Sequence, residues 1–385
     1  MDNLKVMKKL YDKMGNDYLR STALTAAGLL GLRKDVIRMD TNQMCNIRCI
    51  MCNSKPQMKC FPYMKFEYFQ KIIDQFAPTA RMCYLSCAFE PLITPNFADY
   101  VKYAKDKGIP HVSFCTNGLL LKEDVICKLI ECQTDEIIFS FNGFCKNDYN
   151  RIMDGSNFEV VCGNLRRLAE LKKQAHSVKP HVRLNTIMLK SNFQHFDDMY
   201  QLIKDYDIDL IQFRELMLYE DQNDPSKVNK ELLEGQTPEE YHNMMKIIRD
   251  YTKRLKAIGK EIILPASFLN HYNPALSMES AEEFHPLTAD GTDSDKQNEN
   301  AQAWAINKQK NAQKHRCSVP FFSYWIDYLG NVRVCGYDDR GHIGNALSDT
   351  PKLLAKNRKA FQKLALSGQC EHHQCIINVD TSTII

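Results

Sequence analysis

The segment VIRMDTNQMCNIRCIMC, residues 36–52, joins a short apolar run to three closely spaced cysteines. VIRMD (36–40) predicts a buried strand, and five similar runs follow: MCYLSC (82–87), HVSFCT (111–116), EIIFSF (136–141), VRLNTIML (182–189) and DLIQFREL (209–216). Amphipathic stretches lie between them, such as FEYFQKIIDQF (66–76), NFADYVKYAKDKG (96–108) and FDDMYQLIKDYD (196–207). A helix after each strand favours parallel strands with right-handed crossovers. We therefore expect an α/β fold, a partial (β/α)6 TIM-like barrel with its ligand site at the carboxyl ends of the strands.

The chain divides into four predicted regions. Residues 1–35 favour one or two helices, and residues 36–219 hold the partial barrel. Residues 220–314 contain a helical stretch (237–259) and a polar stretch (286–314) typical of a loop or lid. Residues 315–385 form a cysteine-rich extension in which we expect a β-hairpin and a helix.

Composition narrows the class of protein. The 50 basic and 47 acidic residues give a net charge of +3, which offers no argument for nucleic acid or a membrane as partner. The charged N-terminus lacks a secretory apolar stretch, so we expect a cytoplasmic protein. Because that compartment keeps thiols reduced, the fifteen cysteines should be buried fillers or metal ligands rather than disulfides.

The spacing C-x3-C-x2-C at Cys45, Cys49 and Cys52 indicates a metal cluster. Cysteine thiolates are the usual ligands of iron–sulfur clusters, and three of them leave one iron open for another ligand. The alternatives are a zinc knuckle and a chance grouping. A zinc site would need a fourth local ligand; Cys60 is the nearest, and we interpret it as a packing residue.

This spacing, with an apolar residue before the last cysteine, resembles the signature of the radical S-adenosylmethionine (SAM) superfamily. The resemblance implies a [4Fe–4S] cluster whose open iron binds SAM. It also implies that the reduced cluster passes one electron to SAM and releases a 5′-deoxyadenosyl radical, which removes a hydrogen atom from a substrate. A flavodoxin or ferredoxin is the implied electron donor.

Motifs after the second, third and fourth strands extend the resemblance. Glu90-Pro91 resembles the end of the family's Gly-Gly-Glu-Pro segment, although Ala88 and Phe89 replace the glycines. The match implies that Glu90 contacts the SAM amino group, which suits a carboxylate. Thr116-Asn117-Gly118 also occurs in many members, and a plain turn is the alternative for it.

Polar residues on later strands complete the implied SAM site. Ser140, in a segment resembling the family's Ser-x-Asp-Gly, is implied to lie near the ribose. Arg183 and Asn185 on the fifth strand are implied to reach the SAM carboxylate or ribose, with a surface arginine as the alternative. Three residues of the sixth strand can also face the site: Gln212, Arg214 and Glu215. The sequence assigns no catalytic residue.

A second cysteine group comprises Cys317, Cys335, Cys370 and Cys375. WIDYLGNVRVC (325–335) favours a hairpin that turns at Gly330-Asn331, and PKLLAKNRKAFQKLAL (351–366) favours a helix. The region resembles the SPASM and twitch extensions of radical SAM enzymes, and four cysteines match the one-cluster twitch form, which implies an auxiliary [4Fe–4S] cluster. The alternatives are a four-cysteine zinc site and replacement of one thiolate by His372 or His373.

The other cysteines lie mostly in apolar patterns and are predicted to be buried small residues: Cys60, Cys83, Cys87, Cys115, Cys127, Cys132, Cys145 and Cys162. Cys87 and Cys115 lie near strand ends, where a catalytic role is an alternative.

Three functions are compatible with these patterns. We expect an enzyme that oxidises, dehydrates or epimerises a small sugar- or alcohol-like substrate with help from the auxiliary cluster. The first alternative is a peptide- or protein-modifying maturase, which the short segment before the first strand disfavours because it cannot hold a leader-binding domain. The second alternative is a non-catalytic iron–sulfur or zinc protein.

Overall fold

The computed structural model describes residues 35–54, 63–214, 216, 223–231, 238–264, 319–335 and 341–366 of the chain. Within these residues, successive parallel strands form most of one sheet: β1 (Asp35–Met39), β2 (Ala80–Tyr84), β3 (His111–Thr116), β4 (Glu136–Ser140), β5 (His181–Ile187), β6 (Leu210–Arg214) and β7 (Glu261–Ile263). The predicted parallel α/β fold is confirmed. The expectation of six strands is corrected, because β7 pairs with β6 and extends the parallel sheet past residue 219.

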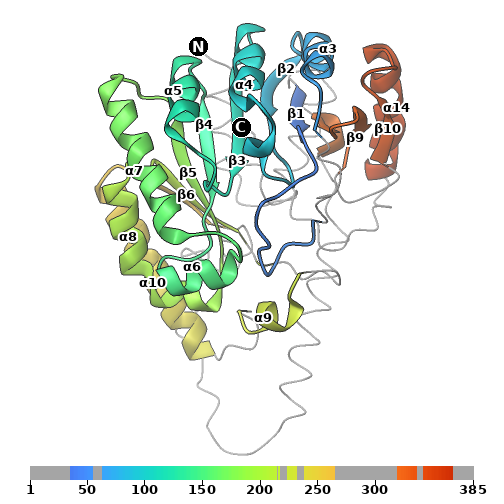
Figure 1. Ribbon diagram of the computed structural model, residues 1–385. Helices are drawn as coiled ribbons and strands as arrows, with labels where there is room; N and C mark the ends of the chain where they lie inside the picture. Colours follow the sequence, from blue (N-terminus) through green and yellow to red (C-terminus); the bar gives the residue numbers. More distant parts are fainter. Residues whose placement is uncertain are drawn as a thin grey trace, which may run out of the picture.

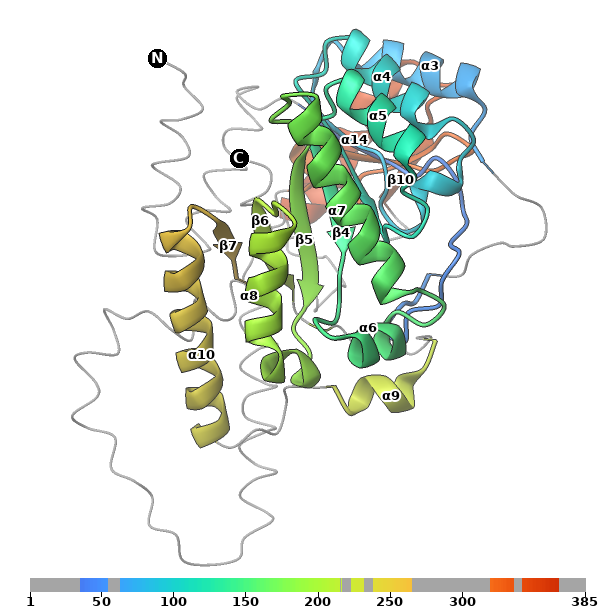
Figure 2. The ribbon, with the colours of Figure 1, turned by 60° about the vertical axis from the view of Figure 1, so that its left-hand side comes forward.

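Helices between the strands cover one face of the sheet (Figure 1). They are α3 (Phe66–Phe76), α4 (Phe97–Asp106), α5 (Glu123–Glu131), α7 (Phe158–Gln174), α8 (Phe196–Asp205) and α10 (Pro238–Ala257). Figure 2 shows α7, α8 and α10 side by side along β4 to β7. The buried residues of α3 are Phe69, Ile72, Ile73 and Phe76, and this spacing places one apolar stripe against the sheet. Two short helices, α6 (Lys146–Ile152) and α9 (Pro225–Asn229), lie beyond the carboxyl ends of the strands.

Alternation along the strands separates two faces of the sheet. Ile37 and Met39 of β1, and Val182 and Leu184 of β5, are buried in the core beneath the helices. The residues between them point to the opposite side, which we call the inner face. The inner face carries polar and aromatic side chains, among them Arg38, Tyr84, Cys115, Glu136, Ser140, Arg183, Asn185, Gln212, Arg214 and Trp325.

The C-terminal segments join this sheet at its other edge. β8 (Ser323–Ile326) runs parallel to β1, and β9 (Asn331–Arg333) and β10 (His342–Asn345) continue the sheet in antiparallel fashion. The predicted hairpin is confirmed: Asp327 Oδ1 accepts hydrogen bonds from the amides of Leu329 and Asn331, and Gly330 has a φ of 82°. The predicted helix is α14 (Pro351–Leu366). This extension therefore continues the barrel sheet through the β1–β8 pairing.

Several predicted regions lie outside the described residues. They include the N-terminal helical segment up to residue 34 and the polar stretch 286–314. None of the described helices combines the length and hydropathy needed to cross a membrane.

Candidate active site

The cysteine loop, residues 42–52, leaves the carboxyl end of β1 and is anchored on both sides. Asn42 Oδ1 accepts from the amide of Met44, and Ile47 and Ile50 are buried. The loop also rests on the segment that ends α6, because the amides of Arg48 and Ile50 donate to the carbonyls of Asp154 and Ile152 at 2.7 and 3.0 Å. The backbone that carries the three cysteines is thus held at the carboxyl edge of the sheet.

The three thiols of this loop share one small region. Burial raises the pKa of the Cys49 thiol, and the neighbouring thiols of Cys52 and Cys45 raise it further. Met153 packs against the same sulfur, with Sγ and Sδ 3.5 Å apart. Such mutual repulsion between thiolates is relieved when a cationic metal centre binds them. Three sulfur donors on one anchored loop therefore fit a [4Fe–4S] cluster with one open iron.

Glu90 ties the loops after β2 and β3 to the cysteine loop. Its Oε1 accepts from the Thr116 hydroxyl at 2.8 Å and its Oε2 from the Asn117 amide at 2.8 Å. Its own amide donates to the carbonyl of Met44. Burial raises the pKa of Glu90 to about 7, although these donors lower it. A cation at this carboxylate would favour its ionised form.

Asn117 links the predicted turn directly to the cysteine loop. Its Nδ2 donates to Asn46 Oδ1 at 2.8 Å, and its Oδ1 accepts from the amide of Leu119. Gly118 has a φ of 78°, so the turn needs a residue that adopts the left-handed region without strain. The structure therefore brings Glu90, Asn117 and the cysteine loop together.

Ser140 and Asn185 form a second predicted pair, on neighbouring strands. They are register partners of β4 and β5, and the Ser140 hydroxyl lies 3.2 Å from Cys115 Sγ. The Oδ1 atom of Asn185 is buried without a hydrogen-bond partner among the described residues. A buried acceptor of this kind indicates a place where a ligand donor fits.

Arg183 lies two residues before Asn185 on β5, towards the amino end of the strand. Its Nε and Nη2 donate to the carboxylate of Glu136, both at 2.8 Å, and its Nη1 donates to Gln212 at 3.0 Å. The guanidinium is thus engaged in a buried ion pair. That pairing argues against the predicted contact with SAM, which stays a prediction. Glu215 lies outside the described residues.

Sequence reasoning missed a cation between two aromatic rings on the inner face. The Arg38 guanidinium carbon lies 5.5 Å from the ring centroid of Tyr84 and 5.2 Å from that of Trp325. Arg38 is the register partner of both, because β1 lies between β2 and β8. Trp325 Nε1 is also buried without a partner among the described residues. No local signal predicts this group, since it depends on the β1–β8 pairing.

The second cysteine group is described at only one of its positions. Cys335 is buried just after β9. Cys317, Cys370 and Cys375 lie outside the described residues, as do Cys60, His372 and His373. The auxiliary cluster therefore stays a prediction.

Comparison with known proteins supports the predicted resemblance. Residues 40–203 match the sequence profile of the radical SAM superfamily. This segment contains the cysteine loop, Glu90, Asn117, Ser140 and both predicted residues of β5. Residues 40–203 are therefore similar to a radical SAM domain, and members of that family hold a [4Fe–4S] cluster and SAM.

Individual relatives are distant. A protein of Pyrococcus furiosus named as a tungsten-containing aldehyde ferredoxin oxidoreductase cofactor-modifying protein is 24% identical over 174 residues, covering 44% of this chain and 48% of that protein. A GTP 3',8-cyclase of Limosilactobacillus fermentum is 26% identical over 216 residues, covering 55% and 58%. The chain thus matches about half the length of these curated relatives.

Solved structures share the fold. SuiB of Streptococcus suis has a TM-score of 0.56 at 10% identity, covering 87% of this chain and 72% of SuiB. The protein anSMEcpe with bound AdoMet has a TM-score of 0.55 at 19% identity, covering 87% and 86%. At these identities the likeness concerns the fold alone.

Proposed function

We propose that this protein is a radical SAM enzyme acting on a small, sugar- or alcohol-like substrate that carries an anionic group. The observation that supports the substrate class is Arg38, held between Tyr84 and Trp325 on the inner face. A guanidinium offers forked donors for a phosphate or carboxylate, and the flanking rings hold it by cation–π contacts. The relatives named as GTP 3',8-cyclases agree with a small anionic substrate.

In this proposal the chain's own residues hold and orient the cofactors. Cys45, Cys49 and Cys52 hold the cluster, and Met153 packs against Cys49. Glu90 is the acceptor for the SAM amino group, held by Thr116 and Asn117, and Ser140 and Asn185 face the nucleoside. The cluster and SAM, when bound, supply the electron and the radical that removes a hydrogen atom from the substrate.

The positive character of the inner face reaches beyond Arg38. Burial raises the pKa of the Tyr84 hydroxyl well above its ordinary value, and the guanidiniums of Arg214 and Arg38 act in the opposite direction. The Arg38 guanidinium carbon lies 5.5 Å from the centroid of the same ring. This arrangement supports an anionic rather than a neutral substrate.

The proposed extension completes the enzyme. Cys335 would join Cys317, Cys370 and Cys375 in an auxiliary [4Fe–4S] cluster that accepts an electron from the substrate during oxidation, dehydration or epimerisation. Anaerobic reconstitution should then yield about eight irons per chain, because each cluster holds about four. About four irons per chain would leave the radical SAM assignment intact and remove the auxiliary cluster.

Substrate capture tests the proposed class. The reconstituted enzyme, SAM and reductant are mixed with cell-extract metabolites separated by charge, and 5′-deoxyadenosine formation is followed. We expect acceleration by a protease-resistant, low-mass fraction that binds an anion exchanger. Acceleration only by a protease-sensitive fraction would instead support the peptide-modifying alternative.

An Arg38→Met variant tests whether Arg38 on the inner face binds the substrate in that fraction. Loss of a charge-assisted hydrogen bond of about 1.5–3 kcal/mol should raise the KM for the active fraction roughly 10- to 100-fold. The slow cleavage of SAM without substrate should be unchanged, because Arg38 is not assigned to the cluster or to SAM. An unchanged KM would contradict the role of Arg38.

A further inference from the structure

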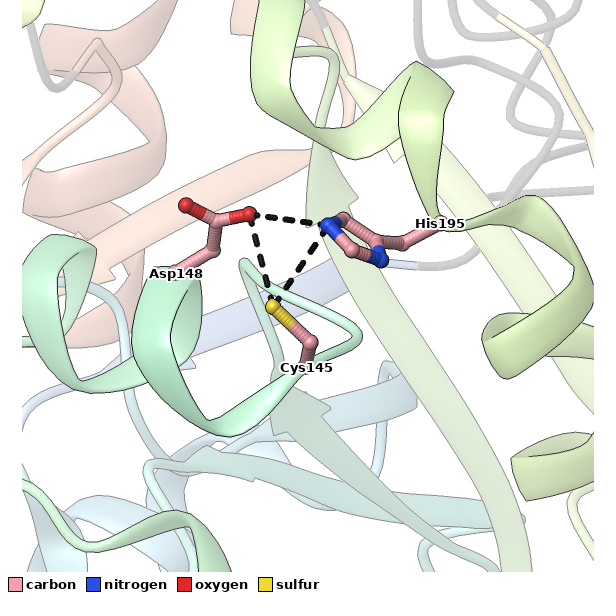
Figure 3. Close-up of side chains that lie close together, drawn as sticks. All are labelled: Cys145, Asp148 and His195. Carbon is pink, nitrogen blue, oxygen red and sulfur yellow. Dashed lines mark hydrogen bonds and ion pairs between the residues drawn. The ribbon is translucent and has the colours of Figure 1, made fainter.

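A mixed group of potential metal ligands lies at the carboxyl edge of the sheet, apart from the cysteine loop. Cys145 immediately precedes α6, Asp148 is in the first turn of that helix, and His195 immediately precedes α8. Figure 3 shows the sulfur, one carboxylate oxygen and one ring nitrogen pointing toward one another. Cys145 is only partly buried. The prediction of buried packing residues is therefore wrong for Cys145, as it is for Cys87, Cys115, Cys127 and Cys132, and is confirmed for Cys83 and Cys162.

The three donor atoms form a compact triangle. Cys145 Sγ lies 3.5 Å from Asp148 Oδ2 and 3.6 Å from His195 Nε2, and those last two atoms are 3.3 Å apart. Tetrahedral zinc with bonds of about 2.3 Å to sulfur and about 2.0–2.2 Å to nitrogen and oxygen separates its ligands by about 3.6 Å for S–O and S–N, and about 3.4 Å for N–O. The observed triangle has the dimensions of one face of such a tetrahedron.

We propose that Cys145, Asp148 and His195 bind a Zn²⁺ ion, with the fourth position open to water. One sulfur, one imidazole nitrogen and one carboxylate oxygen are all common zinc ligands. The mixture of sulfur, nitrogen and oxygen donors distinguishes this site from the all-sulfur cysteine loop.

Neighbouring side chains orient two of these ligands. Asp198 Oδ2 lies 2.9 Å from His195 Nδ1. The carboxylate therefore accepts a hydrogen bond from Nδ1–H, which leaves the lone pair of Nε2 for the ion. Arg151 Nη2 donates to Asp148 Oδ1 at 2.8 Å, which leaves Oδ2 for the metal. Each ligand that has a second polar atom thus has that atom engaged elsewhere, as in established zinc sites.

The same atoms could instead form an activated thiol, with His195 as base. The position of Asp148 disfavours this alternative, because its carboxylate lies 3.5 Å from the sulfur and opposes the charge of a thiolate. A divalent cation among the three atoms balances both negative groups. The contacts therefore favour a metal site over a nucleophile.

The position of the site would let the ion link two helices. It would fasten the start of α6 to the start of α8, and the segment ending α6 carries the cysteine loop through Asp154 and Ile152. The ion would thereby steady the support of the SAM-binding cluster without contacting SAM. This role depends on the proposed function only through the cysteine loop, whereas zinc binding itself does not depend on it.

Metal content tests the site in the full chain. The protein is first loaded anaerobically with iron and sulfide, so that the cluster cysteines are occupied, then equilibrated with Zn²⁺ and passed over a weak chelating resin. We expect about one zinc per chain, and loss of that zinc with unchanged iron in His195→Ala. The control is Cys127→Ser, because Cys127 is also partly exposed but lies on α5. This variant should retain both metals. Retention of the zinc in His195→Ala, or no zinc in the parent, would overturn the proposal.

Two further variants guard against misfolding as an explanation. Asp198→Asn should weaken Zn²⁺ affinity by about 10- to 100-fold while leaving the saturated stoichiometry unchanged. With Co²⁺ as the probe, Cys145→Ser should lose the thiolate-to-cobalt charge-transfer absorption. An unaltered cobalt spectrum in Cys145→Ser would exclude the sulfur as a ligand, and an unaltered affinity in Asp198→Asn would remove its orienting role.

Discussion

Toward the two ends of β5, polar side chains of the inner face differ in their hydrogen bonding. Toward the amino end, Arg183 is paired with Glu136 and Gln212, and each of its guanidinium nitrogens has a partner. Two residues later, Asn185 has a buried oxygen without a partner among the described residues, beside Ser140. The hydrogen-bonding groups of Arg183 are paired within the protein, whereas the Asn185 oxygen can still accept a hydrogen bond from a ligand. We therefore expect Arg183 to affect stability and Asn185 to affect the proposed ligand site, so that each can be tested alone.

Removing a cluster ligand should give the largest effect on activity. Cys49→Ala should lose the roughly four irons of the SAM-binding cluster and abolish SAM cleavage, because the remaining two thiolates cannot hold it. Iron analysis and 5′-deoxyadenosine assays measure both effects, with Cys127→Ser as the matched cysteine control. Full activity in Cys49→Ala would remove this loop from the active site.

Breaking the ion pair should give the largest effect on stability. In the parent protein, burial raises the pKa of Glu136, but contacts with His111 and Arg183 outweigh that effect. Arg183→Met leaves this carboxylate buried without its guanidinium partner. We expect a loss of about 3–5 kcal/mol in the free energy of unfolding, measured by urea denaturation. Lys146→Met, which breaks an exposed pair with Glu159, should cost less than about 1 kcal/mol. Equal losses in the two variants would contradict the assignment of Arg183 to a buried, stabilising ion pair.

Asp40 provides a pH-dependent comparison at the base of the cysteine loop. Burial raises its pKa from 3.8 to about 6, although the amides of Cys87 and Ala88 donate to it. The folded protein therefore binds more protons than the unfolded chain between these values. Its stability should fall by about 2–3 kcal/mol as pH rises from about 4 to about 6, relative to Asp40→Asn.

This difference is measured by denaturation of both proteins across that pH range. Asp205→Asn, at an exposed position on α8, controls for the loss of one negative charge. Parallel pH profiles for the parent and Asp40→Asn would show that Asp40 is not buried in its neutral form.

The smallest expected effect is that of replacing Asn185, whose side-chain oxygen has no partner among the described residues. Asn185→Leu removes a buried acceptor that has no partner, so the ligand-free protein should gain about 1 kcal/mol in stability. SAM affinity should fall about tenfold, because the proposed hydrogen bond is lost. Thermal denaturation and equilibrium binding give the two quantities. A destabilised variant with normal SAM affinity would place Asn185 among the structural residues.

Much of the fold is predictable because its signals are local. The predicted helix at 351–366 coincides with α14, and the third strand with β3. The cysteine loop is predictable for the same reason, since its three ligands lie on one short segment. The Gly330 turn follows from the preference of glycine for a positive φ.

Long-range pairing explains what could not be predicted. The contact of Arg38 with Trp325 requires β8 to join β1, and no periodicity in either segment encodes that choice. Cys145 and His195 lie on two separate loops, and their contact likewise depends on how distant segments pack together. Alternation shows which face Arg183 occupies, but its pairing with Glu136 depends on the register between β4 and β5.

The most direct measurement is SAM cleavage by the anaerobically reconstituted chain with a chemical reductant. We expect 5′-deoxyadenosine and methionine in equal amounts, and neither product from a Cys45→Ala/Cys49→Ala/Cys52→Ala variant. Undiminished cleavage in that variant, or a parent protein that takes up zinc and no iron, would contradict it.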